Sequence, residues 1–244
     1  VAEKVIVSLF VNPKQFSRGE DLDRYPRVFA KDLAVLSELN VDMVFTPSVD
    51  TMYPKSFQSQ VSNFGFAQGL CSLTRPDFFS GVCTIVLKLF NIISPEFAVF
   101  GKKDYQQLRV IQEMVKDLNL KTEILSGEIV RSQTGLALSS RNQYLSSSEL
   151  EQASYFPRSL RVAETLLKQG VDCVQAVILG VKKSLLSYDL QPEYLQLRGL
   201  STFKNIEGKI VEPSILLAAI RLGKTRLIDN IELHRGAIVH VSRI

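Results

Sequence analysis

The hydrophobic pattern of the first 45 residues predicts a strand, a helix and a second strand. Residues 5–11 form a nearly continuous run of apolar and β-branched side chains, which is typical of a strand buried on both faces of a parallel sheet. Apolar side chains then recur at helical spacing from Phe29 to Leu36, and residues 41–45 are again apolar. Strand, helix and strand in this order form the βαβ unit of a parallel sheet.

The same alternation continues through the middle of the chain. Residues 82–93 are apolar nearly all round, which fits either a buried helix or a strand by periodicity alone, and Pro95 ends the run. Further predicted elements follow as a strand, a helix and two extended segments, at residues 98–100, 108–118, 123–125 and 129–130. This alternation predicts an α/β domain built on a parallel sheet.

The arrangement of predicted elements changes after about residue 145. Ser146 and Glu149 form a capping-box signature that opens a predicted helix extending to about Leu167. A second helix and three strands follow, at about residues 174–186, 194–197, 215–220 and 226–231. Helices followed by strands indicate a second, α+β domain.

Length and composition agree with two modest domains. The chain has 244 residues, of which 45% are hydrophobic and 22% charged, so it can bury a core. We expect residues 1–144 to form the α/β domain, residues 145–233 a smaller α+β C-terminal domain, and residues 234–244 a tail. The net charge is +4 with the charges interspersed, so no nucleic-acid partner is expected, and no apolar run approaches the length of a membrane span.

Cysteine and histidine usage excludes several chemistries. Cys71, Cys83 and Cys173 are odd in number and far apart, which is neither a disulfide framework nor a zinc ligand set. A reducing compartment, the cytoplasm, is therefore expected. His234 and His240 are the only histidines, and we expect both to be solvated, so the body of the chain offers no imidazole for a Ser-His-Asp or Cys-His arrangement.

The first candidate site segment follows the first predicted strand. Ligands of an open parallel sheet bind at the carboxyl ends of its strands, which is where Asn12 and Gln15 stand. A glutamine amide can hydrogen-bond a carboxylate or hydroxyl of a ligand. An Asn-Pro turn with a solvated glutamine is the structural alternative.

The second candidate segment, Gly101–Gln107, leads from a predicted strand into a helix. Gly101 lets a ligand approach the backbone closely, N–H groups at a helix start favour a phosphate, and Lys103 adds a positive charge. Gln107 is expected about one turn further, on the same face as Lys103. A charged, solvated helix N-terminus is the alternative.

The third candidate segment is Ser139–Arg141. Two hydroxyls followed by a guanidinium on a loop can stabilise the charge of a transferring phosphoryl group, although a structural turn would have the same sequence. Asp21, Asp23 and Asp32 lie near the first strand, but Mg²⁺ often relies on substrate phosphates and water, so we expect these carboxylates to be solvated and assign no metal ligand.

Taken in order, several segments resemble the pantothenate synthetase family, the pantoate–β-alanine ligases. They read VSLFVNPKQF, EDLDRYPR, RPDFFSGV, KLFNI, FGKKDYQQ, LALSSRN and RLGKTRLIDN, at residues 7–16, 20–27, 75–82, 88–92, 100–107, 136–142 and 221–230. The resemblance is collinear and covers about residues 3–233.

The resemblance implies a Rossmann-like nucleotidyltransferase domain with a parallel sheet, a smaller α+β C-terminal domain and a homodimer. It implies an ATP-dependent ligase that makes pantothenate, the precursor of coenzyme A. The pantoate carboxylate would attack the α-phosphate of ATP, giving pantoyl adenylate and pyrophosphate. The β-alanine amine would then attack the adenylate, giving pantothenate and AMP. Mg²⁺ accompanies the ATP in this family, and no protein nucleophile is required.

The resemblance also implies roles for individual residues. Those implied to bind substrate are Gln15, for pantoate and β-alanine, and Gln107, for pantoate, and Asn12 is a further substrate-binding candidate from its position after the first strand. Those implied to bind ATP are Gly101, Lys102, Lys103, Asp104, Val130, Leu138, Ser139, Ser140 and Arg141, with Lys103 on the phosphates. Those implied to act in catalysis are Lys103, Ser139, Ser140 and Arg141.

The chain departs from the family pattern at its start. Family members carry a further strand and a helix with a His-x-Gly-His motif before the strand at residues 5–11, and the motif's histidines bind ATP phosphates. This sequence opens at Val1 almost directly on a strand, so we expect an N-terminal segment to be missing. The expected activity is pantoate–β-alanine ligation, and the alternative is a catalytically weak or inactive homologue that binds pantoate or forms the dimer.

Overall fold

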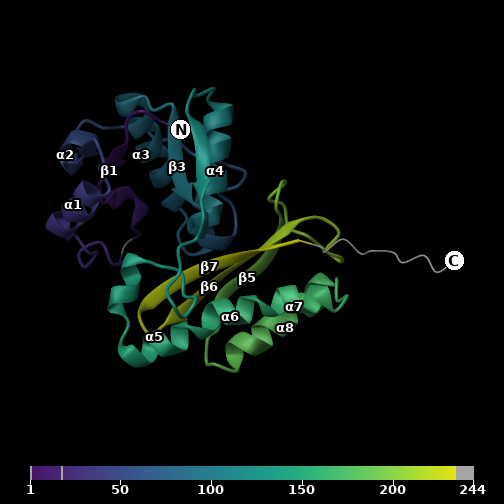
Figure 1. The fold of residues 1–244 in the computed structure, drawn as a ribbon. Helices are drawn as coiled ribbons and strands as arrows, with labels where there is room; N and C mark the ends of the chain where they lie inside the picture. The colour runs from purple at the N-terminus through teal and green to yellow at the C-terminus, as the bar shows by residue number, and fades with distance from the viewer. Residues whose placement is uncertain (1, 18, 235–244) are drawn as a thin grey trace. The chain divides into compact units, whose positions relative to one another are not determined.

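The computed structural model describes residues 2–17 and 19–234, and its contacts divide the chain into two units (Figure 1). The first unit contains the chain up to Phe100 together with Gln106–Gly127, and the second contains Gly101–Tyr105 and the chain from Glu128 onward. The division falls before residue 128 instead of at the expected 144, because the turn at 140–144 packs against the last strand of the second unit.

The first unit begins with the predicted βαβ arrangement. Strands β1 (Ile6–Ser8) and β2 (Met43–Phe45) pair in parallel, and helix α1 (Phe29–Glu38) connects them. The expected burial of the first strand on both faces is wrong, because Ile6 of β1 is 39% exposed. Its partner in the neighbouring strand β2, Met43, is 58% exposed. The reason is that α1 buries none of its residues and β1 pairs with β2 alone among the described strands.

Helix α3 (Phe78–Ile93) resolves the ambiguity of the apolar run in favour of a helix. It starts earlier than expected, buries eight of its residues and ends where Ser94 takes a left-handed conformation before Pro95. Strand β3 (Phe97–Gly101), helix α4 (Tyr105–Asp117) and strand β4 (Glu123–Gly127) follow, and β3 pairs with β4.

Shorter elements complete the first unit. They are the 3-10 turns η1 (Pro13–Gln15) and η2 (Leu70–Leu73) and the helix α2 (Val49–Met52), while residues 129–130 lie outside any named strand. The parallel sheet therefore appears as two separate strand pairs in the described residues.

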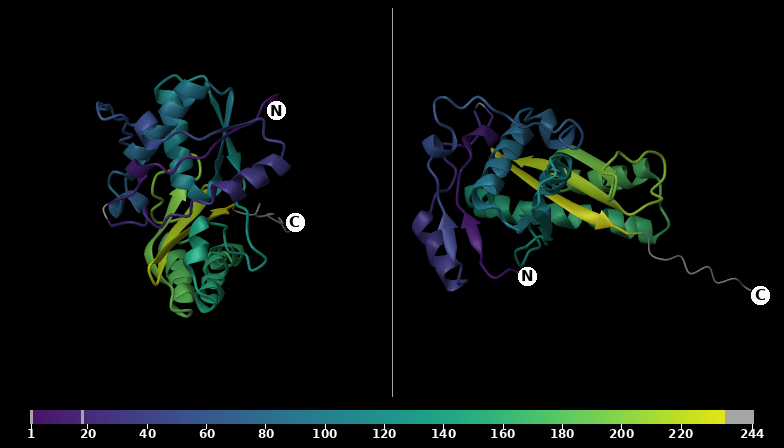
Figure 2. Two further views of the ribbon diagram at one scale, coloured as in Figure 1. Left: turned by 90° about the vertical axis from the view of Figure 1, so that its left-hand side faces the viewer. Right: turned by 90° about the horizontal axis from the view of Figure 1, so that it is seen from above.

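The second unit contains an antiparallel sheet with helices packed on it. Strands β5 (Gln191–Gly199), β6 (Ser214–Leu222) and β7 (Thr225–Leu233) occur in the order β5-β6-β7, and each is longer than predicted. The β6–β7 hairpin turns at Gly223, whose φ of +55° suits glycine. Its helices lie beside the sheet (Figures 1 and 2), and they are α5 (Ser147–Ala153), α6 (Tyr155–Leu160), α7 (Val162–Lys168) and α8 (Val174–Leu186).

The capping box at Ser146 and Glu149 is confirmed, but the single helix predicted after it is three short helices. Pro157 has no N–H to donate to the carbonyl four residues earlier, which interrupts the helical hydrogen bonds near this point. The chain keeps right-handed helical angles at Ser154 and Arg161, between the segments.

The core of the second unit lies between the sheet and its helices. Apolar residues of α6 and α8, such as Phe156 and Val181, pack in one buried cluster with Leu216 and Ile220 of β6. All but one of the nine residues of β6 are buried, so this strand is the centre of the unit. No helix in the described part of the chain is long and apolar enough to cross a membrane.

Gly81 of α3 lets the turn after β1 lie directly on this helix. A Cβ atom at Gly81 would overlap the carbonyl group of Lys14, and the Asn12 Nδ2 donates to the Gly81 carbonyl over 3.1 Å. The turn and the helix backbone are therefore in closer contact than any side chain permits.

We expect Gly81→Ala to lower the free energy of unfolding by about 1–3 kcal/mol, since the turn must move off the helix. Denaturant unfolding followed by circular dichroism measures the change. Gly65→Ala is the matched control, because its Cβ would come no closer than 3.8 Å to another residue, and it should stay within about 0.5 kcal/mol of the original protein. Equal effects of the two substitutions would contradict the close contact.

The three cysteines should react at very different rates. Cys173 is exposed, whereas Cys71 and Cys83 are buried, and burial raises the pKa of the Cys83 thiol to about 11. We expect a thiol reagent at pH 7.5 to modify Cys173 rapidly and the other two only on unfolding. Peptide mass spectrometry after timed labelling checks this, and early modification of Cys83 would contradict the described burial.

Candidate functional site

The turn after β1 carries the first expected substrate residues. Asn12 is buried, and its amide is fully engaged: besides its bond to Gly81, its Oδ1 accepts from the Tyr53 hydroxyl over 2.9 Å and from the Lys14 N–H over 3.3 Å. Burial raises the pKa of Tyr53 to about 12, so this hydroxyl stays a donor at neutral pH. These contacts make Asn12 a support for the turn.

Gln15 ends the same turn and has a different environment. Its side-chain amide makes no hydrogen bond within the described residues, while its backbone carbonyl accepts from the Arg75 Nη2 over 2.6 Å. Arg75 also pairs with Glu20 at 2.7 Å and stacks on the Phe78 ring at 3.9 Å. The backbone at Gln15 is therefore fixed, and its amide is left for a ligand.

The adjacent glutamines of α4, Gln106 and Gln107, differ in the hydrogen bonds of their side-chain amides. The Gln106 amide is buried, accepts from the Cys71 N–H over 3.1 Å and donates to the Phe66 and Gly69 carbonyls. The Gln107 amide is half-buried and makes no hydrogen bond to any described residue. Sequence analysis singled out Gln107 as a ligand residue, and the structure adds the buried supporting role of Gln106.

The segment Gly101–Asp104 forms a 3-10 turn, η3 (Lys102–Asp104), ahead of α4. Lys103 therefore lies in the turn before α4. The spacing had predicted that Lys103 and Gln107 share a face of one α-helix, and that α-helical spacing does not apply to Lys103. Gly101 has an ordinary φ of −73°, and a Cβ atom placed there would meet no described atom within 4 Å. The space beside this backbone is open to a ligand, and the backbone angles alone do not require glycine.

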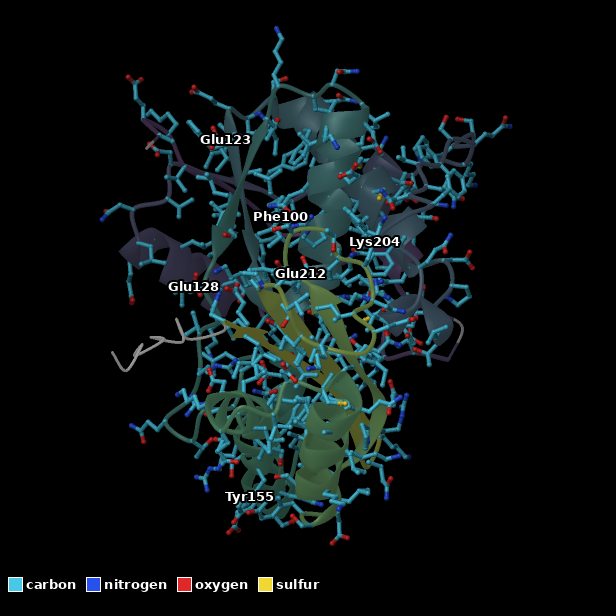
Figure 3. All side chains as sticks on the ribbon, turned by 90° about the vertical axis from the view of Figure 1, so that its right-hand side faces the viewer. Phe100, Glu123, Glu128, Tyr155, Lys204 and Glu212 are labelled. Carbon is cyan, nitrogen blue, oxygen red and sulfur yellow. The ribbon has the colours of Figure 1, made fainter. Side chains whose placement is uncertain are left out.

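The two lysines of this turn differ in their partners. The Lys102 ammonium lies 2.6 Å from Glu128, labelled in Figure 3, and 3.2 Å from Glu232, and the hydrogen bond to Glu128 is the main cause of its raised pKa. Among the described acidic side chains, the Lys103 ammonium has only Asp104 within 4 Å, at 3.8 Å. Lys103 is thus the cation better placed to receive a phosphate.

Val130 and Leu138 lie opposite each other in a short hairpin of the second unit. The Leu138 N–H donates to the Val130 carbonyl over 2.9 Å, and Arg131 and Ala137 form an antiparallel bridge beside them. Their side chains remain 67% and 51% exposed. Opposite residues of a hairpin share a face, so the pair forms an exposed apolar platform suited to a nucleoside.

The Ser139–Arg141 segment directly follows this platform. Ser139 precedes the 3-10 turn η4 (Ser140–Tyr144), and its hydroxyl accepts from the Arg141 N–H over 3.3 Å. Ser140 and Arg141 also take part in interactions within the structure. This stretch is an ordered turn whose hydroxyls and guanidinium follow the platform along the chain.

Asp229 and Asn230 of β7 support both of the segments of the second unit that are expected to bind ATP. Asp229, 2% exposed, binds Arg131 through two parallel bonds of 2.7 and 2.9 Å, and Asn230, 4% exposed, donates to the Lys102 and Lys103 carbonyls. Sequence reasoning assigned neither residue a role. Two adjacent polar residues within an apolar strand were the available signal, because buried polar groups need partners.

The structure groups the expected site residues within units. Strand β7 contacts both the turn at 102–104 and the turn at 140–144, which brings the expected ATP-binding segments together in the second unit. Asn12, Gln15 and Gln107 belong to the first unit.

The remaining candidate groups are metal ligands and the two histidines. The described residues contain no group of three histidine, cysteine or acidic side chains able to hold a metal ion. His234 is largely exposed, with Nε2 3.4 Å from Glu232, which agrees with the expected solvation, and His240 lies outside the described residues.

Comparison with known proteins places the chain in a family. A family model described as Pantoate-beta-alanine ligase matches residues 1–232. The pantothenate synthetases of Shewanella amazonensis and Caldicellulosiruptor bescii are 43% and 44% identical over 236 and 230 residues. These matches cover 96% and 93% of this chain and 83% and 80% of the relatives.

Solved structures agree with the family match. A pantothenate synthetase from Thermus thermophilus superposes with a TM-score of 0.90 at 37% identity, covering 94% of this chain and 83% of that one. A pantoate-beta-alanine ligase from Francisella tularensis, complexed with beta-gamma ATP and beta-alanine, has a TM-score of 0.75 at 33% identity, covering 94% and 79%. The expected mixed α/β fold is confirmed, and this chain belongs to the pantoate–β-alanine ligase family.

Proposed function

We infer that this protein joins pantoate to β-alanine in an ATP-dependent ligase reaction. The observation that carries this conclusion is the family match over residues 1–232, which includes every segment of the site. The Francisella relative, complexed with beta-gamma ATP and beta-alanine, supports two of the three substrates.

The first step forms pantoyl adenylate. A carboxylate oxygen of pantoate attacks the α-phosphorus of ATP, the bond to the β-phosphate oxygen breaks, and pyrophosphate leaves with the electron pair. Gln15 and Gln107 have amides available to orient pantoate. Lys103, Ser139, Ser140 and Arg141 stabilise the charge on the phosphates, and the Val130–Leu138 platform borders the nucleoside.

The second step transfers the acyl group. The neutral amine of β-alanine attacks the carbonyl carbon of the adenylate, a C–N bond forms, and AMP leaves as the C–O bond to phosphate breaks. The nitrogen releases one proton as the amide forms. No side chain of the protein bonds covalently to substrate, so catalysis depends on position and charge.

We propose that Mg²⁺ binds with ATP, mainly through the nucleotide phosphates and water. Magnesium commonly takes oxygen ligands from substrate phosphates and water, and the family resemblance supports its presence with ATP. When bound, the ion would neutralise phosphate charge.

We further propose a homodimer located in the cytoplasm. The family resemblance supports the dimer, and an odd number of widely spaced cysteines supports a reducing compartment. Light scattering of the purified protein tests the dimer directly.

The reaction predicts a defined product pattern. With ATP, Mg²⁺, pantoate and β-alanine, we expect AMP, pyrophosphate and pantothenate in equal amounts by mass spectrometry. Without β-alanine, pantoate-dependent pyrophosphate release should stop after one turnover, and without pantoate none should occur. Pantoate binding with no pyrophosphate release would support the inactive homologue instead.

Substitution of Lys103 should weaken ATP binding much more than substitution of Lys102. Lys103→Gln should weaken ATP binding ten- to hundredfold with unchanged stability, because a charged hydrogen bond to phosphate is worth about 1.5–3 kcal/mol. Lys102→Gln should change ATP affinity much less, since its ammonium is bound to Glu128 and Glu232. Calorimetric titration with MgATP measures both, and a larger loss for Lys102→Gln would contradict this division of roles.

A further inference from the structure

The turn at Lys102–Asp104, called the nucleotide turn below, is held in place by the side-chain amide of Asn230. The Nδ2 of Asn230 donates to the Lys102 carbonyl over 2.9 Å and to the Lys103 carbonyl over 3.1 Å. Asn230 is buried, so these bonds are shielded from water and costly to leave unmade. The donor and its acceptors are 127 and 128 residues apart in sequence.

A second contact from the same strand face fixes the turn. Residues two apart on a strand point to the same side, and Glu232 follows Asn230 at this spacing. Glu232 lies 3.2 Å from the Lys102 ammonium, which also binds Glu128. Strand β7 therefore binds the turn through two backbone carbonyls and through the Lys102 side chain.

The bonds to Asn230 determine the direction of the facing N–H group. In a trans peptide the carbonyl and the following N–H point to opposite sides. Since the Lys102 carbonyl points to Asn230, the Lys103 N–H points away from it. That N–H belongs to the three-residue turn η3 and to the same residue as the ammonium expected to receive a phosphate.

The adjacent residue supports the other nucleotide segment from the opposite strand face. Asp229 forms the two-bond ion pair with Arg131, which also donates to the Gly135 carbonyl over 3.0 Å. The hairpin that carries Val130 and Leu138 is therefore fixed to β7 one residue away from the nucleotide turn.

We propose that Asn230 is a positioning residue for ATP: it orients the Lys102–Lys103 backbone so that the Lys103 N–H and ammonium meet the nucleotide phosphates. The proposal rests on the ATP-dependent function proposed above. Asn230 acts only through the turn and not on the reacting atoms.

The test compares Asn230→Ala with Glu193→Gln in the otherwise unchanged protein. Glu193 is the matched control, because it also holds ion pairs in the same sheet, with Arg221 of β6 and Arg226 of β7 instead of with the turn. Calorimetry with MgATP gives affinity, steady-state kinetics give KM and kcat for ATP and β-alanine, and hydrogen exchange reports on the 101–107 peptide.

Asn230→Ala should raise the Kd and KM for ATP about tenfold, a change of about 1.4 kcal/mol, and leave the KM for β-alanine within twofold. Amide exchange should accelerate in the 101–107 peptide and not in the Glu193→Gln control. Asn230→Ser, which keeps a donor on a shorter side chain, should fall between the two, and it carries the test alone if the alanine variant does not fold.

The measurements distinguish failure of the positioning role from failure of the proposed function. If the original protein binds MgATP and the Asn230 variants bind it within twofold as well, the positioning role is overturned and the proposed function stands. If kcat alone falls while KM for ATP and exchange at 101–107 match the control, Asn230 is merely structural and the proposal is overturned. If the original protein binds no MgATP, the proposed function falls and this proposal with it.

Discussion

The ion pair between Arg131 and Asp229 is the interaction on which the proposed ATP-binding part of the site depends. Asp229 is almost fully buried, and a lone carboxylate there would be strongly unfavourable without the guanidinium that binds both its oxygens. The pair fixes the 130–138 hairpin to β7 and so sets where its exposed apolar platform lies. The next residue, Asn230, fixes the nucleotide turn, so one strand of a rigid sheet serves as the reference for both segments.

The two units differ in how completely they bury their apolar residues. The second unit has a continuous cluster between sheet and helices, with β6 buried almost throughout. The first unit leaves apolar side chains of β1, α1 and β2 exposed, including Phe29 and Met43. Local opening requires least energy where few apolar contacts are lost, so the β1–α1–β2 region should open more readily than the second unit.

The sequence predicted the kind and order of most elements because hydrophobic spacing dictates them, and the capping box at Ser146 is a short-range feature. It did not predict the exposure of β1, the helix breaks near Pro157 or the division before residue 128, since each depends on contacts with distant residues. Local sequence features indicated three candidate segments, and the resemblance assigned roles to their individual residues. The supports Asn230, Asp229 and Gln106 were missed because their roles come from partners far along the chain.

The placement of Gly101–Tyr105 in the second unit bears on when the protein becomes competent during its synthesis. The ribosome releases this turn long before it makes Asn230, which lies 127 residues after Lys103. Early domains fold while later chain is still being added, so the first unit can begin to fold with the turn still unsupported. A nascent chain therefore lacks the Asn230 support of this turn until β7 has emerged and joined the sheet. A chain that ends before β7 would keep the two glutamines yet lack the support that orders the turn.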